Sequence, residues 1–205
     1  MSTEQGDESG VAPYGAAVRE HAAATLPLHT TTGHGDVGEE HISPLQHSRV
    51  GRANQRYDGA TRLLACVVVV RPAPDAGSAV STPSSRQVLL ISSSKHPDEW
   101  ILPKGGWEDD ESIEECAHRE AEEEAGVTGS IVSDLGQLDF ATHKGSPCRL
   151  YGFVLQCERQ YAHWAESSRR RKWVSFEEAH TFLQKRSELL HMLRRAQQAD
   201  GADEA

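Results

Sequence analysis

The sequence has few of the features that mark secreted or membrane proteins. Its four cysteines among 205 residues form no CxxC pair and have no ligand spacing with histidine, which argues against a zinc site or a disulfide framework. The first residues lack a basic segment followed by an apolar one, and no apolar run approaches the roughly 18 residues of a membrane span. We therefore expect a cytoplasmic protein without a membrane partner, with the nucleus as a second location.

Acidic residues outnumber basic ones, but the net charge of −10 is unevenly distributed. Residues 1–50 carry seven acids and two bases, and residues 200–205 carry three acids and no base. Ten more acids crowd between residues 108 and 124 around one arginine, whereas the rest of residues 51–199 has 18 bases and 11 acids. An acidic spot in a basic background suits a site shared by a divalent metal and a polyanion. Solvated acids on a surface helix would give the same counts.

The length is sufficient for one domain with a core and too short for two of ordinary size. Residues 1–55 are rich in Gly, Ala, Thr, Ser and His and predict a disordered tail, followed by a domain over 56–198 and an acidic tail over 199–205. A Pro/Ser/Gly-rich loop is expected at 72–85, and two helices should close the chain. Apolar and β-branched runs predict strands at residues 63–70, 88–91, 100–103, 131–138, 150–156 and 172–174.

A short helix with recognisable ends is predicted after residue 112. Ser112 and Glu115 have the spacing of a capping box, and Gly126 suits the left-handed residue that follows a helix. A second capping box, Ser175 with Glu178, opens the last segment, which we interpret as a structural cover.

Three glutamates of this helix, Glu120, Glu123 and Glu124, lie at positions i, i+3 and i+4 and so share one face. Like charges at this spacing destabilise a helix unless something compensates them. Arg119 can pair with one acid, such as Glu111, but cannot neutralise them all. A hard divalent cation can, because Mg²⁺ prefers carboxylate oxygens and also binds water and substrate phosphates.

Residues 105–127 read Gly-x5-Glu-x7-Arg-Glu-Ala-x-Glu-Glu-x-Gly-Val, which resembles the box of the Nudix hydrolases without a mismatch. The resemblance implies an α+β fold, an α/β/α sandwich around a mixed sheet. It also implies that the box forms a loop–helix–loop unit that holds Mg²⁺ or Mn²⁺ against a diphosphate. By position, Glu111 and Arg119 match the pair that braces the loop on the helix.

The same resemblance assigns the chemistry. Glu120 and Glu124 match metal ligands, Glu123 matches a ligand or general base, and Gly105 brings its backbone near the metal. A metal that bridges phosphate oxygens lowers the barrier to attack by water on a phosphoanhydride. We expect Glu123 to act as the base, and Glu120, Glu124 and Arg119 to complete the catalytic set.

Residues 48–196 resemble the diphosphoinositol polyphosphate phosphohydrolases, which also cleave diadenosine polyphosphates. The resemblance is carried by the segments GRANQRYDG, VLLISSSKHPDEWILPKGGWE, RRRKWVSFEEA and RSELLHMLRRA. It implies that cationic side chains and loop amides hold a substrate with many phosphates. The predicted substrate contacts are Arg62, Ser93, Ser94, Lys95, Lys104, Gly105, Gly106, Lys144, Arg169 and Arg171.

Three functions remain in competition at this stage. The leading one is metal-dependent hydrolysis of diphosphoinositol polyphosphates and diadenosine polyphosphates. The second is hydrolysis of other nucleoside diphosphate derivatives, including the mRNA cap, or of polyphosphate, and the third is a non-catalytic Nudix binding module. The intact set of acids argues against the third. We expect a monomer whose partner is a small polyphosphate, with capped RNA as an alternative.

Overall fold

A computed structural model describes residues 42–73 and 86–202 of the chain. The predicted tail up to residue 41, most of the predicted loop at 72–85, and the end of the predicted acidic tail lie outside the described residues. The domain boundary expected at residue 56 stays a prediction. Residues 42–55 are described, and several of them contact the first helix.

The described residues form one eight-stranded sheet and three helices. The strands are β1 (Tyr57–Asp58), β2 (Thr61–Pro72), β3 (Arg86–Ser92), β4 (Trp100–Ile101), β5 (Lys104–Gly106), β6 (Val127–Ala141), β7 (Pro147–Gln160) and β8 (Arg171–Ser175). The helices are α1 (Ile113–Ala125), α2 (Phe176–Leu183) and α3 (Ser187–Ala202).

The sheet is mixed and is organised around β2. The main order is β4-β3-β2-β7-β6, while β1 and β5 also pair with β2, and β8 pairs with β3. Among the described strand pairs, only β2 and β7 run parallel, with Cys66 opposite Gly152 at the middle of their register. Parallel neighbours need a crossover between them, and this crossover contains the box helix α1.

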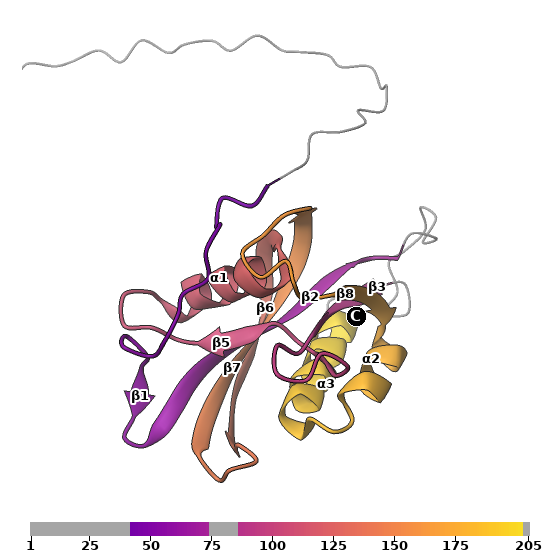
Figure 1. Cartoon of the computed structure of the whole chain (residues 1–205). Coiled ribbons are helices and arrows are strands. Elements are labelled where there is room, and N and C mark those ends of the chain that lie inside the picture. The colour runs from indigo at the N-terminus through magenta and orange to yellow at the C-terminus, as the bar shows by residue number, and fades with distance from the viewer. Residues whose placement is uncertain (1–41, 74–85, 203–205) are drawn as a thin grey trace, which may run out of the picture. The chain divides into compact units, whose positions relative to one another are not determined.

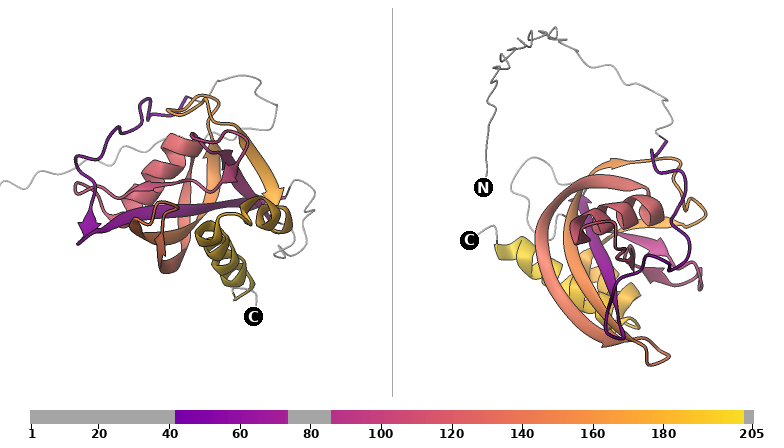
Figure 2. Two further views of the ribbon diagram at one scale, coloured as in Figure 1. Left: turned by 60° about the horizontal axis from the view of Figure 1, so that its bottom comes forward. Right: turned by 90° about the vertical axis from the view of Figure 1, so that its left-hand side faces the viewer.

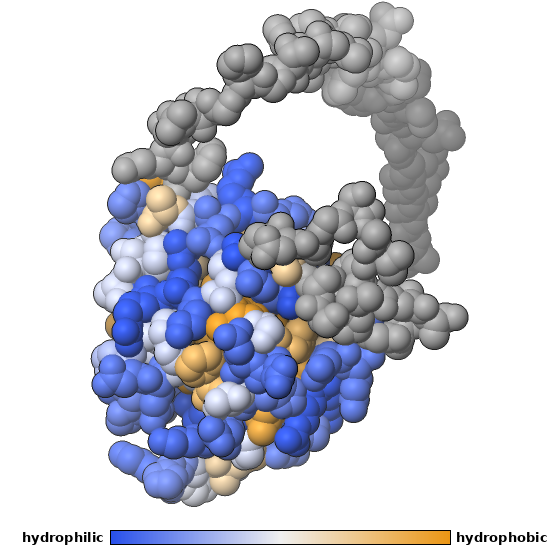
Figure 3. Space-filling model, turned by 90° about the vertical axis from the view of Figure 1, so that its right-hand side faces the viewer, coloured by the Kyte–Doolittle hydropathy of each residue, from blue (hydrophilic) through white to orange (hydrophobic). Residues whose placement is uncertain are grey.

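Helices cover both faces of the sheet, with α1 on one side and α2 and α3 on the other (Figures 1 and 2). The run from Leu63 to Val70 is buried throughout, because a strand covered on both faces exposes neither set of alternate side chains. The outer face shown in Figure 3 is mainly hydrophilic where it is coloured, with a few hydrophobic residues near its centre. The predicted α/β/α sandwich around a mixed sheet is confirmed.

The predicted strands and helices are present, although β4 covers only the first two residues of the strand predicted at 100–103, and β6 and β7 are longer than their patterns suggested. Strands β1 and β5, which are two and three residues long, have no counterpart among the predicted strands. Two of the three residues of β5 are glycines, which disfavour strands, so its conformation depends on pairing with β2. In the part of the chain that the structure describes, no helix has the length and apolarity needed to cross a membrane.

Candidate active site

The ends of α1 are held by the predicted caps. The Ser112 hydroxyl accepts from the Glu115 N–H at 3.1 Å, and the Glu115 carboxylate accepts from the Ser112 N–H at 2.7 Å. At the other end, Gly126 has φ 61° and ψ 42°, the left-handed conformation that ends many helices. These caps fix where the helix begins and ends, and therefore which side chains face the loop before it.

Strand β5 brings the glycine that starts the box against α1. Gly105 pairs with Ala65 of β2, and a Cβ atom added to Gly105 would lie 2.1 Å from the Glu120 Oε1 atom. A side chain at residue 105 would have to displace the Glu120 carboxylate, which Arg119 holds, so glycine lets the backbone approach this carboxylate closely. The structure thus brings Gly105 and Glu120 together, as the resemblance implied.

Arg119 connects the box loop to the acidic face of α1. Its Nε and Nη2 atoms donate to the two carboxylate oxygens of Glu111 at 2.8 and 2.7 Å, and Nη2 also donates to the Gly106 carbonyl at 2.9 Å. Its Nη1 atom lies 2.7 Å from the Glu120 carboxylate and 3.4 Å from that of Glu123. The predicted Glu111–Arg119 pair is observed with two-point geometry, which is the strong form of this interaction.

The buried acids of the box fall into two groups by pKa. Burial tends to raise the pKa of Glu111, but hydrogen bonds from the Arg119 guanidinium and the Glu108 N–H outweigh it and leave the pKa lowered. Burial, followed by the charge of Glu124, raises the pKa of Glu120. Burial also raises the pKa of Glu123 and of Glu124. Arg119 therefore stabilises Glu111 as a carboxylate, whereas the trio on α1 is under-compensated.

This set of donors fits a hard divalent cation. Three buried carboxylates with raised pKa values would be stabilised in their charged form by a nearby cation, and carboxylate oxygens are the ligands that Mg²⁺ prefers. Within residues 42–73 and 86–202, however, no three acidic, histidine or cysteine side chains converge as a ready metal site. Glu120 is turned toward Arg119, and Glu124 accepts from the Nη2 atom of Arg169 at 2.7 Å.

Residues before β1 contact the same acidic face, which the sequence had not indicated. The Ser43 hydroxyl donates to Glu122 at 2.5 Å, and the Arg49 N–H lies 3.3 Å from both carboxylate oxygens of Glu123. The Arg49 side chain bridges Glu108 and Asp110, each at 2.7 Å. One observation could have pointed to this contact: Arg49 is one of only two basic residues in residues 1–50.

A cavity of about 490 Å³, here called the cationic cavity, lies beside the box. Six lysine or arginine side chains and one carboxylate, that of Glu124, line it. Its lining includes seven of the predicted substrate contacts, namely Arg62, Ser93, Ser94, Lys95, Lys104, Gly105 and Arg169. A lining with this excess of positive charge favours a polyanionic ligand.

Arg169 is the most buried cation of this cavity and the one that reaches the acidic trio. Besides its bond to Glu124, its Nε atom donates to Glu166 at 2.6 Å. Its Nη1 atom is buried and has no hydrogen-bond partner among the described residues. Because buried donors are nearly always paired, this orphaned N–H favours an anionic ligand in the cavity.

Three predicted substrate contacts do not line the cationic cavity: Gly106, Lys144 and Arg171. The Arg171 guanidinium lies 3.8 Å from the centre of the Trp164 ring and donates to the Ala125 carbonyl at 3.0 Å, so it supports the end of α1. Arg169 and Arg171 were predicted to contact the substrate together. However, β8 begins only at Arg171, and Arg169 lies in the turn before it.

Apart from Glu124, eight lining residues are absent from the predicted contacts, and four of these carry a hydroxyl, an imidazole or a positive charge: Arg52, His96, Thr142 and Arg186. Arg186 lies between α2 and α3, in a segment that we had interpreted only as a structural cover. The one feature of the sequence that could have indicated a role for Arg186 is its position as a basic residue just before a predicted helix. A cluster assembled from segments this far apart in the sequence has no local pattern that predicts it.

Comparison with known proteins identifies the class. The NUDIX domain model matches residues 72–195, which is more than half of the chain. The chain is 38% identical over 146 residues to Nudix hydrolase 13, mitochondrial, from Arabidopsis thaliana, covering 64% of this chain and 72% of the relative. The chain therefore belongs to the Nudix family of hydrolases, which generally use divalent metal cations.

A narrower likeness is found to the mouse diphosphoinositol polyphosphate phosphohydrolase 3-alpha. The two are 41% identical over 101 residues, which is 48% of this chain and 60% of the mouse protein. Among solved structures, the cocrystal structure of the NUDIX domain of Shewanella oneidensis NrtR complexed with ADP ribose matches with a TM-score of 0.53 at 20% identity. It covers 70% of this chain and 93% of that one and supports the fold alone.

The expected cytoplasmic location, with the nucleus as a second one, is wrong on these comparisons. Nudix hydrolase 13 and several other Arabidopsis thaliana relatives are named as mitochondrial proteins. Our expectation depended on the lack of a secretory leader and of an apolar span. Neither feature distinguishes the cytoplasm from an organelle, because import into organelles uses other signals.

Proposed function

We propose that this protein hydrolyses the phosphoanhydride bonds of diphosphoinositol polyphosphates and diadenosine polyphosphates. The observation that carries the proposal is the contact between the two halves of the site, where Arg169 of the cationic cavity donates to Glu124 of the acidic trio at 2.7 Å. A phosphate chain in the cavity would therefore extend toward the carboxylates. The named mouse relative supports the substrate class.

Glu120, Glu123 and Glu124 would hold Mg²⁺ or Mn²⁺, with the backbone of Gly105 beside Glu120. When bound, the metal would neutralise phosphate oxygens and orient the bond to be cleaved. Arg119 holds Glu120 on one side and the box loop on the other, so it positions the ligands.

Glu123 is the proposed general base. Burial raises its pKa, which improves a carboxylate as a proton acceptor near neutral pH. The Arg49 N–H, 3.3 Å from both of its oxygens, holds the carboxylate in place. A water molecule that loses its proton to Glu123 would attack the phosphorus atom, and the bridging oxygen would leave with the departing phosphate.

Substrate binding is assigned to the cationic cavity. Arg62, Lys95, Lys104 and Arg169 supply positive charge, and Ser93 and Ser94 supply hydroxyl donors. The Lys104 N–H is occupied by Glu124 at 2.9 Å, so the contribution of Lys104 to substrate is its side chain. The predicted contacts of Gly106, Lys144 and Arg171 remain predictions.

The test is turnover with Mg²⁺ on three substrates in parallel: diphosphoinositol pentakisphosphate, diadenosine hexaphosphate and capped RNA. We expect the full chain to cleave the first two and to leave the third largely intact, measured by chromatography of the products. Faster cleavage of capped RNA would replace the proposed substrate class. Binding of all three without cleavage of any would favour the non-catalytic module.

A further inference from the structure

The segment before β1 runs beside the loop that leads into α1. The Arg56 N–H donates to the Trp107 carbonyl at 2.8 Å, and Gln55 forms an isolated antiparallel bridge with Glu108. The Gln55 side chain is partly buried between this loop and the start of β2. Gln55 is absent from the predicted site residues and does not line the cationic cavity.

The Gln55 carboxamide can face in only one direction. Its Nε2 atom donates to three carbonyls, that of Leu63 at 2.8 Å and those of Arg56 and Trp107 at 3.0 Å. Since only the nitrogen end of a carboxamide donates, these carbonyls direct the oxygen end away from themselves. The Oε1 atom accepts from the Nε atom of Arg62 at 2.7 Å. The carboxamide therefore holds the Arg62 guanidinium at a fixed position beside the box loop.

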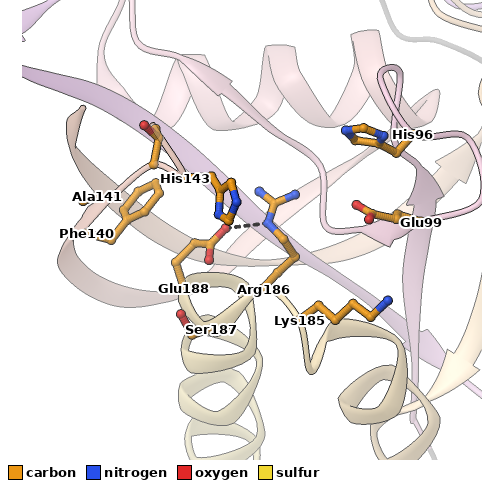
Figure 4. Close-up of a pocket in the computed structure, with 10 residues that line it drawn as sticks. His96, Glu99, Phe140, Ala141, His143, Lys185, Arg186, Ser187 and Glu188 are labelled. Atoms are coloured by element: carbon orange, nitrogen blue, oxygen red, sulfur yellow. Dashed lines mark hydrogen bonds and ion pairs between the residues drawn. The ribbon is translucent and has the colours of Figure 1, made fainter. Parts of the chain in front are cut away.

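Two other arginines that line the cationic cavity have a different kind of partner. The Nε atom of Arg169 donates to the Glu166 carboxylate at 2.6 Å. The Nε atom of Arg186 donates to the Glu188 carboxylate at 2.8 Å (Figure 4). Arg62 donates to a neutral carboxamide instead, and no ion pair of the described residues includes it. A carboxylate both orients a guanidinium and offsets its charge, whereas a carboxamide only orients it.

The surroundings of Arg62 leave its charge uncompensated. Burial, followed by the charge of Arg52, lowers the pKa of Arg62. A phosphate group in the cavity would oppose both effects, because an opposite charge stabilises the protonated guanidinium. Within the described residues, the two η nitrogens of Arg62 donate to no acceptor, so they are available to such a group.

Gly106 leaves the space in which the two side chains meet. A Cβ atom added to Gly106 would lie 2.0 Å from the Gln55 Oε1 atom and 2.8 Å from the Arg62 Nη2 atom. The carboxamide cannot simply move aside, because three carbonyls hold its other end. A side chain at residue 106 would therefore disturb the bond between Gln55 and Arg62.

We propose that Gln55 is a positioning residue for phosphate binding, which holds the Arg62 guanidinium at the cationic cavity without neutralising it. The proposal rests on the proposed function, in which this cavity binds the phosphates. Gln55 itself contacts no substrate and acts only through Arg62. A change at Gln55 should therefore weaken binding when Arg62 is present and have no further effect when Arg62 has been removed.

The experiment is a double-mutant cycle on binding, which is independent of hydrolysis. The full chain is titrated calorimetrically with inorganic tripolyphosphate in magnesium-free buffer, as wild type, Gln55→Met, Arg62→Ala and the double variant. Methionine keeps the unbranched shape of glutamine but cannot orient the guanidinium. Gln198→Met is the matched control, since Gln198 is exposed on α3 and its side chain makes no hydrogen bond with the described residues. Thermal melting checks that each variant is folded.

We expect Arg62→Ala to weaken binding about tenfold or more, as for a charged hydrogen bond, and Gln55→Met to weaken it about three- to tenfold. The double variant should bind no more weakly than Arg62→Ala, and Gln198→Met should bind like wild type. Additive losses in the double variant would overturn the proposal, because Gln55 would then act independently of Arg62. Wild-type affinity of Gln55→Met would overturn it as well.

Arg62→Lys tests the same point with every bond of Gln55 to the three carbonyls left in place. Lysine keeps the charge but carries its only nitrogen at the end of the side chain, so nothing donates to Gln55 from the Nε position. We expect a loss of affinity of at least about threefold. Wild-type affinity of this variant would show that charge alone is sufficient and would overturn the role of Gln55.

Steady-state kinetics separate positioning from general support of the box loop. On diadenosine hexaphosphate with Mg²⁺, Gln55→Met should raise KM about three- to tenfold and change kcat by less than about twofold. A fall in kcat at unchanged KM would overturn the proposal.

The outcome is distinguishable from that of the proposed function. A protein that shows the coupled losses with tripolyphosphate but cleaves nothing in the three-substrate assay keeps the role of Gln55 and loses the proposed activity. A protein that cleaves diphosphoinositol pentakisphosphate but shows additive losses keeps the activity and loses the role of Gln55.

Discussion

The acidic face of α1 and the cationic cavity meet at one contact but are built in opposite ways. The acidic half comes from one capped helix, and its three glutamates are buried, each at least 93% removed from solvent. The cationic half is assembled from residues between 52 and 186, and two of its six cations, Arg52 and Lys95, are exposed. Buried charges interact strongly and demand fixed partners, whereas exposed ones are screened and adjust to a ligand.

This difference suggests that the acidic half carries out the chemistry and the cationic half binds the substrate. The acidic half is held rigid by Arg119, Arg49 and the caps of α1, as a set of metal ligands and a base should be. The cationic half contains one buried cation, Arg169, among more exposed ones, which suits a cavity that accepts different phosphate chains. If this assignment is correct, substitutions in the acidic half should lower kcat and substitutions in the cationic half should raise KM.

The largest effect is expected from Glu123→Gln, which keeps the shape of the side chain but removes its ability to accept a proton. We expect kcat on diadenosine hexaphosphate to fall about 10²- to 10⁴-fold, the usual contribution of a general base. KM should change little, because Glu123 does not line the cationic cavity. The measurement is steady-state kinetics with Mg²⁺.

Glu114→Gln is the control for this variant, because it is an exposed glutamate of the same helix. It should leave kcat at the wild-type value. Full activity of Glu123→Gln would show that Glu123 is not the general base. A rise in KM without a fall in kcat would show that Glu123 contributes to substrate binding, which contradicts the assignment of chemistry to the acidic half.

A second large effect is expected on stability from Arg119→Ala. The substitution leaves the buried carboxylates of Glu111 and Glu120 without their guanidinium partner, and breaking a buried pair in this way costs about 3–5 kcal/mol. Urea unfolding should show this loss in the free energy of unfolding. Added Mg²⁺ should recover part of it if the metal takes over the compensation of Glu120.

Arg159→Ala is the matched control, since Arg159 is exposed and its side chain makes no hydrogen bond or ion pair with the described residues. Its effect should stay within about 0.5 kcal/mol, as for most surface substitutions. If Arg119→Ala cost no more than this control, the acidic half would not depend on the arginine, and its described rigidity would need another cause.

The acidic half could be predicted from the sequence because everything that forms it is local. The capping box of Ser112 and Glu115, the left-handed Gly126 and the i, i+3, i+4 spacing of the glutamates all act within one helix. The Glu111–Arg119 pair also spans only eight residues. Local interactions are those that a periodic pattern and a spacing rule can predict.

The cationic half could be predicted only in part, because its geometry depends on contacts between distant segments. Strand β5 exists only because Lys104–Gly106 pair with β2, and Arg186 reaches the cavity only because α2 and α3 pack on the sheet. Arg171 was predicted to contact the substrate beside Arg169, but Arg169 lies in the turn before β8 and Arg171 is the first residue of that strand. The contact of Arg49 with Glu123 joins residues 74 positions apart, which no local pattern reveals.

The smallest of these effects is expected from Arg169→Ala. This variant also tests most directly whether chemistry and binding belong to separate halves of the site. Removing a charged hydrogen-bond donor costs about 1.5–3 kcal/mol of binding, so KM should rise about ten- to a hundredfold. The rise should be larger for diphosphoinositol pentakisphosphate, which carries more phosphate groups, than for a plain dinucleotide, with kcat less affected. Arg170→Ala is the matched control, because Arg170 is exposed and lies over Trp100 outside the cavity. Equal increases in KM for both substrates would argue against a role of Arg169 in recognising the more highly phosphorylated substrate. A large fall in kcat would show that its bond to Glu124 makes Arg169 part of the acidic half.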